Sequence, residues 1–363
     1  MANQYGNNLH LSIYGGSHDA EIGMHLGGFP KGFALDPEAL QRFMARRAPK
    51  GGPLSTPRKE ADLPEFLTGL ADGVTTGDEI HAVIRNQNAH SKDYSFIYDT
   101  PRPGHADYPA LCKYGPTVDL RGGGHFSGRL TAPLCIAGGL ALQYLESRGI
   151  RIGAHVEAIH NVRDRRFDPV DPDNGCFEQL KALPLPVLDE QAGVAMQEAV
   201  AAARAEGDSV GGVVECAVTG LAIGLGEHIF NGVEGRLASI LFSIPAVKGV
   251  EFGAGFGSAA LLGSENNDPY CINGDRITTA TNNCGGILGG MTNGMPLLFR
   301  VAFKPTPSIA KEQQTVSLAR MEPATLSVPG RHDPTVVVRA VPVVEAAAAL
   351  AVLDLLLDEN SEL

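Results

Sequence analysis

The stretch over residues 100–131 constrains this chain more than any other, because it combines turn-forming prolines and a triple glycine with many titratable side chains. A glycine loses more conformational freedom on folding than any other residue, so ordering such a stretch is costly. Stretches of this kind persist mainly where the backbone must approach a ligand closely. An ordinary charged surface loop is the alternative interpretation. The charged and titratable residues are Arg102, His105, Asp107, Lys113, Asp119, Arg121, His125 and Arg129.

Composition excludes several classes of protein. With 363 residues, 44% hydrophobic and 19% charged, the chain can bury a sizeable core. The formal net charge of −12 argues against general nucleic-acid binding. The 6 cysteines show no C-x-x-C spacing, so neither a metal site nor a disulfide framework is predicted, and a reducing cytosol fits best. We find no stretch long enough to span a membrane and expect a soluble cytoplasmic protein.

Hydrophobic periodicity and end signals predict both strands and long helices. No repeat or convincing linker interrupts them, so we expect a single α+β domain over residues 1–363. The predicted strands cover residues 9–13, 80–85, 151–160, 211–224 and 297–303, and the predicted helices cover residues 36–48, 131–148, 189–206 and 343–357. In the second helix, Gly138 and Gly139 indicate close packing. His155 and His160 are interpreted as structural, because residues five apart on a strand point to opposite faces.

Three loops contain most of the candidate catalytic and anion-binding side chains. They cover residues 15–19, 102–129 and 304–333. They suit an acid–base enzyme acting on a small, multiply anionic substrate, with His18 and His105 as proton-transfer candidates. A merely solvated His18 is the alternative. Arg46 and Arg47 belong to a basic run over residues 39–59 that would attract an anion, or would form a solvated helix end.

Motifs of other enzyme classes are missing from the sequence. No G-x-S-x-G elbow, Walker loop or zincin motif occurs. The glycine-rich residues 243–257 are weak support for a nicotinamide oxidoreductase, because no strand–GxGxxG–helix frame surrounds them.

Ordered sequence blocks resemble the chorismate synthase family over nearly the whole chain. They include GNNLHLSIYGGSH, RPGHADY, SIPAVKGVEFGAGF, TNNCGGILGG, KPTPSI and GRHDP. The resemblance implies a β-α-β sandwich and a homotetramer with the cofactor FMN buried near subunit contacts. It also implies 1,4-elimination of phosphate from 5-enolpyruvylshikimate 3-phosphate, with reduced FMN required and NADPH as a candidate reductant.

The resemblance also assigns roles to individual residues. His18 matches a histidine that protonates the leaving phosphate, and His105 one that protonates the reduced flavin. Asp333 matches an aspartate that assists removal of the substrate ring proton. Matches to cofactor-binding positions are His125, Phe126, Ser127, Ala246, Gly289, Lys304, Pro305, Thr306, Pro307, Ser308 and Arg331; matches to substrate-binding positions are Arg46, Arg47 and Arg129.

Some positions depart from the family pattern. Gly16 stands where the family usually has Glu, Asp19 where it has Gly, Pro53 and His125 where it has Arg, and Leu130 where it has Glu. The change at Pro53 affects expected substrate contacts more than flavin contacts, and Lys50 is a candidate to compensate. A flavin-binding relative with lost or altered activity is therefore the alternative hypothesis.

Overall fold

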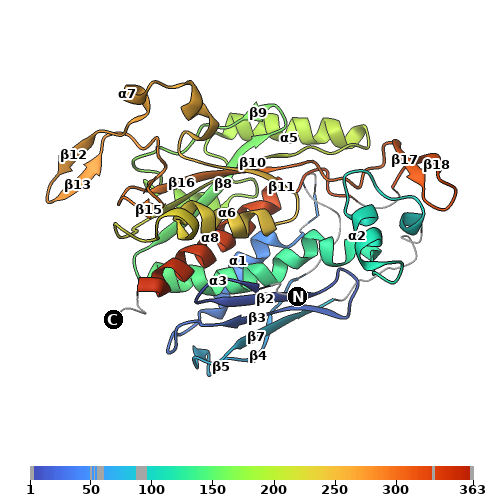
Figure 1. Ribbon diagram of the computed structural model, residues 1–363, viewed down its shortest axis with the longest axis horizontal. Coiled ribbons are helices and arrows are strands. Elements are labelled where there is room, and N and C mark those ends of the chain that lie inside the picture. The colour runs from blue at the N-terminus through green and yellow to red at the C-terminus, as the bar shows by residue number, and fades with distance from the viewer. Residues whose placement is uncertain are drawn as a thin grey trace.

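Two antiparallel sheets enclose a layer of long helices in the computed structural model, which describes residues 4–49, 51–52, 54, 61–86, 96–328 and 332–359 (Figure 1). The first sheet has the order β1 (Gln4–Tyr5), β2 (His10–Gly15), β3 (Glu21–Gly27), β7 (Ile80–Arg85) and β4 (Glu65–Thr68). The second has the order β11 (Val247–Phe252), β16 (Leu297–Phe303), β10 (Gly212–Thr219), β8 (Arg151–Ile159) and β9 (Val162–Arg163). The expected positions Lys50, Pro53 and Arg331 lie outside the described residues.

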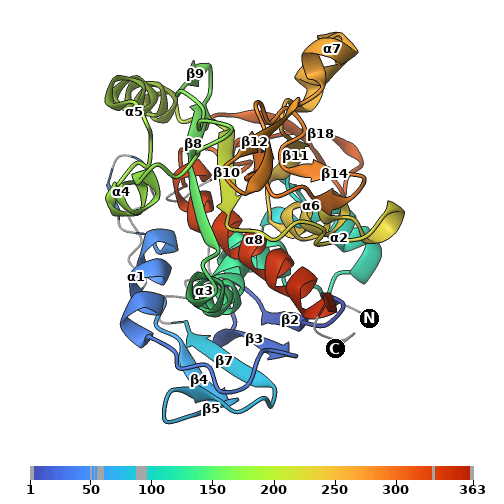
Figure 2. The same cartoon turned by 90° about the vertical axis from the view of Figure 1, so that its left-hand side faces the viewer.

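The helices of the middle layer are α1 (Pro37–Arg47), α3 (Thr131–Ser147) and α8 (Val337–Glu359), with α6 (Val233–Ser243) packed against α8 and β11. Figure 2 shows α3 and α8 between the two sheets. A Cβ atom added to Gly138 would lie 2.3 Å from the Cβ atom of Ala346, so the two helix backbones approach closely. This confirms that Gly138 marks tight packing. One continuous hydrophobic core joins both sheets to these helices, which favours the prediction of a single domain.

Local signals position the middle layer well. The carboxylate of Asp36 accepts hydrogen bonds from the backbone N–H groups of Glu38 and Ala39, so α1 begins where its capping residue predicts. The strands predicted over residues 80–85 and 297–303 are confirmed as β7 and β16. The helix predicted from residue 189 is α5 (Glu190–Ala205), capped by Asp189.

Helix α8 differs from the prediction in two ways. It begins at Val337 and continues through Pro342, although proline removes a backbone donor from a helix. Among the described residues, α8 is the one helix long and apolar enough to cross a membrane, so the expectation that no stretch reaches that length was wrong. Since 89% of its most apolar window is buried inside the protein, α8 is the core helix of the sandwich.

The outer face of the second sheet is covered by residues 164–189, including α4 (Cys176–Ala182). Phe167 and Phe177 in this segment are buried against Leu298 of the sheet, so the segment is part of the packed structure. Helix α5 packs against β8 and β9 at the adjoining edge (Figures 1 and 2).

Peripheral elements complete the chain. They are the hairpins β5 (Leu70–Ala71) with β6 (Val74–Thr75), β12 (Tyr270–Asn273) with β13 (Arg276–Thr279), β14 (Ile287–Leu288) with β15 (Met291–Thr292) and β17 (Gln313–Ser317) with β18 (Glu322–Leu326), the helices α2 (Asp107–Tyr114) and α7 (Gly263–Asn266), and the short 3-10 turns η2 (Arg121–Phe126), η3 (Gly128–Leu130), η4 (Ile229–Asn231) and η5 (Gly255–Ala260). The β12–β13 hairpin and α7 project away from the sandwich (Figure 1).

Candidate functional site

A cavity of about 620 Å³ opens where several elements end or begin. Helix α1 ends there at Arg47, α3 begins at Thr131, and β16 delivers the loop over residues 304–308. The cavity has the size typical of small-molecule sites. The predicted site residues on its wall are Arg47, His105, His125, Phe126, Ser127, Arg129, Ala246, Lys304, Thr306, Pro307, Ser308 and Asp333.

The triple glycine brings the two candidate histidines to the same place. Gly122, Gly123 and Gly124 all have positive φ angles (58°, 92° and 51°), a backbone region that side chains disfavour. A Cβ atom on Gly122 would lie 2.6 Å from Nε2 of His18, and one on Gly123 would lie 3.3 Å from Nε2 of His105. Both imidazoles therefore pack against one bare backbone segment. His18 lies just behind the cavity wall, to which its neighbour Ser17 contributes.

His105 is held by a buried carboxylate. Its Nδ1 lies 2.7 Å from Oδ1 of Asp107, whose side chain is fully buried at the start of α2. Arg102 binds the same carboxylate through Nε and Nη2, at 2.8 and 2.7 Å. Burial alone would raise the pKa of Asp107, but the hydrogen bonds from Arg102 and His105 outweigh it and hold that pKa far below its usual range.

Two arginines on the wall share a second buried carboxylate. Nη1 of Arg47 lies 2.6 Å from Oδ2 of Asp62, and Nη1 of Arg129 donates to Oδ1. Thr131 and Asn86 bind the remaining edges of the two guanidinium groups. Although burial raises the pKa of Asp62, the two arginines lower it overall. Both guanidinium groups are thus fixed before any ligand arrives, which reduces the entropic cost of binding.

Arg46 points elsewhere, although it neighbours Arg47 on α1. Its guanidinium binds both oxygens of Glu345 on α8, at 2.5 and 2.9 Å. Arg46 does not line the cavity. Pro305 and Gly289 also lie outside the lining, and Gly289 sits in the turn between β14 and β15.

The loop after β16 supplies a cation and hydroxyl groups. Nζ of Lys304 donates to the carbonyl of Gly104, and burial, with the nearby Lys248, lowers the pKa of Lys304. Oγ of Ser308 accepts a hydrogen bond from Arg102 at 3.1 Å. Oγ1 of Thr306 is buried with no hydrogen-bond partner among the described residues. A buried polar atom without a partner is costly, so a ligand with a matching polar group is favoured here.

Asp333 is also fixed by a neighbour. Its Oδ2 lies 2.9 Å from Nη1 of Arg339 on the first turn of α8, and Nε of Arg339 donates to the carbonyl of Arg47. Both side chains line the cavity. No role was predicted from the sequence for Arg339, Asp62, Asp107 or Lys248. Asp107 could have been found from the sequence, because it lies within five residues of both Arg102 and His105. The other three residues meet their partners only in the folded structure.

The cavity is strongly cationic. Among the described residues of its lining, Asp333 supplies the single carboxylate. Its cationic side chains are those of Arg47, Arg102, Arg129, Lys248, Lys304 and Arg339. In a protein of net charge −12, this sign reversal directs an anion to the cavity. Within the described part of the chain, no group of three or more His, Cys, Asp or Glu side chains could hold a metal ion. The arrangement can bind several anionic groups and exchange protons with what it binds.

Comparisons with known proteins agree with this geometry. A family model for chorismate synthase matches residues 9–357. The chain is 45% identical over 373 residues to chorismate synthase from Lancefieldella parvula (100% of this chain, 98% of that protein). It is 46% identical over 358 residues to chorismate synthase from Thermococcus kodakarensis, covering 96% of each. A crystal structure of chorismate synthase matches with a TM-score of 0.77 and 26% identity, covering 98% of this chain and 93% of that one. The expected family resemblance and α+β sandwich fold are confirmed.

Proposed function

Because the chain belongs to the chorismate synthase family and is a carbon–oxygen lyase, we propose that it converts 5-enolpyruvylshikimate 3-phosphate to chorismate and phosphate. The reaction is a 1,4-elimination in which a ring C–H bond and the C–O bond to phosphate break, with no net redox change. One observation carries the proposal. Loops distant in sequence contribute the His105 imidazole, a carboxylate and a set of fixed cations to the lining of a single cavity, and His18 packs against the same triple glycine.

The family resemblance suggests the proposed proton transfers, and the positions of three side chains support them. His18 protonates the departing phosphate, and Asp333 assists removal of the ring proton. His105 would hold a proton for the cofactor. Arg47 and Arg129 bind the carboxylate and phosphate groups, for which a planar guanidinium is suited. Arg46 is left out of this set, because it does not line the cavity and binds Glu345 on α8 instead.

Reduced FMN is the proposed cofactor, and the cavity residues fit it. The buried Oγ1 of Thr306, which has no partner in the described part of the chain, and the ammonium of Lys304 suit a phosphate or a polar ring edge. His125, Phe126, Ser127 and Ala246 would form the remaining wall around the ring. When bound, the reduced flavin supplies electron density that lowers the barrier to phosphate departure. Gly289 and Arg331 stay predictions from the family resemblance.

A homotetramer in the cytoplasm is the proposed setting, with NADPH as the candidate reductant. Exposed apolar side chains between residues 229 and 277 support self-association, since monomers rarely expose many of them together. Tyr270, Ile272 and Ile277 share one face of the β12–β13 hairpin and are 69%, 84% and 65% exposed. A lone two-stranded hairpin is marginally stable in water, so a covering surface from another subunit is favoured.

An anaerobic assay with dithionite-reduced FMN tests the proposal. We expect release of chorismate and phosphate in equal amounts, and none with oxidised FMN. Tight binding of FMN without turnover would favour the alternative of a flavin-binding relative, to which the departure at His125 on the cavity wall points. Repeating the assay with NADPH as sole reductant determines whether the protein reduces its own flavin.

A further inference from the structure

We propose that Asp107 is a positioning residue that fixes the His105 ring with a proton on Nδ1 and with Nε2 directed at the cavity. The inference deepens the proposed function and rests on it for its kinetic consequence. The proposed position and tautomer of the His105 ring depend only on the contacts of Asp107, Arg102 and Gly123.

The carboxylate of Asp107 is saturated with donors. Oδ2 accepts from the backbone N–H of Arg102 at 3.0 Å and from its Nε at 2.8 Å. Oδ1 lies 2.7 Å from Nη2 of Arg102 and 2.7 Å from Nδ1 of His105. An ionised carboxylate offers about four acceptor sites, so all are used. With its side chain fully buried, Asp107 cannot turn away toward solvent.

The contacts favour one tautomer of His105. Arg102 and His105 approach within 3.1 Å of each other, between Nη2 and Nδ1. Nη2 of Arg102 and Nδ1 of His105 both contact Oδ1 of Asp107. This shared acceptor explains why they lie close together without a hydrogen bond between them. A proton on Nδ1 satisfies the shorter contact, the one to the carboxylate. Without Asp107, Nδ1 would instead accept from Arg102, and the proton would move to Nε2.

The opposite edge of the ring is left accessible by a glycine. A Cβ atom on Gly123 would stand 3.3 Å from Nε2 of His105, so any larger residue there would press on this nitrogen. The charged groups nearest the ring are Arg102 and Asp107 from its own segment and Lys304, which binds the neighbouring Gly104 carbonyl. His18 contacts the same triple glycine at Gly122.

This arrangement lets Nε2 give up a proton and take it back. Asp107 stabilises the imidazolium while Nε2 carries a proton, and it keeps Nδ1 protonated when Nε2 has lost it. The ring then returns to the same orientation in every cycle. No oxidant or further reactant is needed, because only a proton moves.

Solid-state NMR of protein labelled with ¹⁵N-histidine tests the tautomer directly in the unsubstituted chain. Subtracting the spectrum of His105→Ala assigns the ring signals. We expect neutral His105 to carry its proton on Nδ1. A neutral ring protonated on Nε2 would overturn the proposal. This measurement needs no turnover, so it is independent of the proposed reaction.

Kinetics of Asp107→Asn test the consequence. We expect kcat to fall about 100-fold, in the range for loss of a working acid–base group, while the KM for substrate changes less than about threefold. The pH–rate profile should change as well, because the carboxylate that contacts the imidazole at 2.7 Å is gone. An unmoved profile with unchanged kcat would contradict the proposal.

Asp173→Asn is the matched control. Asp173 is likewise paired with an arginine, Arg151, but lies in the segment over the outer face of the second sheet. We expect its kcat and pH–rate profile to equal those of the unsubstituted protein. If the unsubstituted protein shows no elimination at all, the proposed function fails while the tautomer result still decides the role of Asp107.

Discussion

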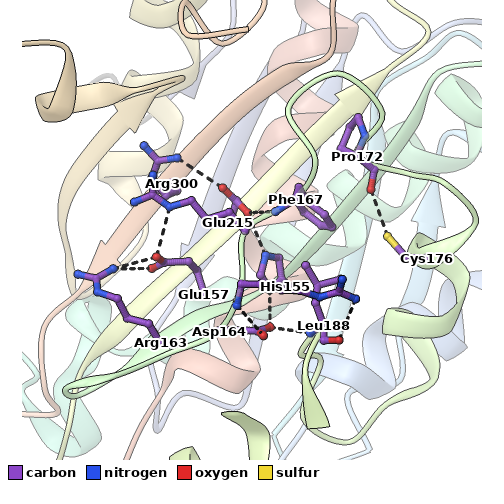
Figure 3. A network of polar contacts seen from close by, with 12 residues as sticks. His155, Glu157, Arg163, Asp164, Phe167, Pro172, Cys176, Leu188, Glu215 and Arg300 are labelled. Carbon is purple, nitrogen blue, oxygen red and sulfur yellow. Dashed lines mark hydrogen bonds and ion pairs between the residues drawn. The ribbon is translucent and has the colours of Figure 1, made fainter. Parts of the chain in front are cut away.

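Two histidines bound to carboxylates show how similar local chemistry serves different ends. His155 on β8 is fully buried, with Nδ1 3.2 Å from Asp164 and Nε2 3.0 Å from Glu215, as Figure 3 shows. His105 contacts the carboxylate of Asp107 through Nδ1, and its Nε2 lies against Gly123, on a ring that lines the cavity. The His155 ring faces a carboxylate at each nitrogen and is closed off from solvent, so it can only hold structure together. The His105 ring borders the cavity and can also exchange a proton.

The polar network around His155 connects neighbouring strands of the second sheet to the segment that covers it. In the sheet register, Glu215 on β10 pairs with His155 on one side and with Arg300 on the other. Glu215 also accepts from the backbone of Phe167, and Asp164 accepts from the backbone of Leu188 (Figure 3). The network therefore fastens the covering segment to the sheet.

The largest expected effect is on turnover at the cavity. His105→Ala should lower kcat by about 10²–10⁴, the usual contribution of a positioned acid or base, while FMN still binds. Anaerobic turnover and flavin titration measure the two quantities. His228→Ala removes an exposed histidine and should change neither. Normal turnover in His105→Ala would remove the distinction between the two histidines.

A substitution in the His155 network should lower stability and leave turnover unchanged. Glu215→Ala leaves His155 and Arg300 buried without their shared carboxylate, at a cost of about 3–5 kcal/mol in the free energy of unfolding. Urea denaturation measures the loss, and turnover per folded site should be unchanged. Glu65→Ala breaks an exposed pair with Arg85 and should cost at most about 1 kcal/mol. A large loss of kcat in Glu215→Ala would contradict a purely structural network.

A smaller effect is expected from two glycine substitutions, whose comparison distinguishes backbone strain from obstruction of Nε2 of His105. Gly123→Ala and Gly149→Ala both place a side chain at positive φ, which costs about 1–2 kcal/mol of stability. Only the methyl group at residue 123 meets His105, because nothing lies within 4 Å of a Cβ atom at residue 149. We expect the two variants to lose equal stability. Only Gly123→Ala should also show a fall in kcat. Equal kcat values would mean that Nε2 needs no open space.

The smallest effect is a pH dependence of stability that arises from His155. Burial lowers the pKa of His155, but the hydrogen bonds to Asp164 and Glu215 raise it overall above the ordinary 6.5. Its contribution is therefore fully present below pH 6.5 and is lost as the pH rises through the raised value. Denaturation midpoints across this range should fall with rising pH, and His155→Gln should flatten the slope. A slope that the substitution leaves unchanged would point to other groups.

Much of the scaffold could be predicted from the sequence, because its signals are local. The capping carboxylate of Asp36 and the alternation over residues 80–85 and 297–303 act within a few residues of where they stand. Ordered blocks also predicted the family. The extent of α8 was missed, since Pro342 is a strong local stop signal that burial in the core overrides.

Tertiary structure alone decided which charged side chains form the site. Arg46 and Arg47 are adjacent in the chain, yet one meets Glu345, 299 residues away, and the other meets Asp62, 15 residues away. Successive helix residues point about 100° apart, so each finds a different partner. Similarly, only the folded chain sets Nε2 of His105 against bare glycine while sealing both nitrogens of His155. The sequence specifies which chemical groups are present, and long-range packing determines which of them stay accessible.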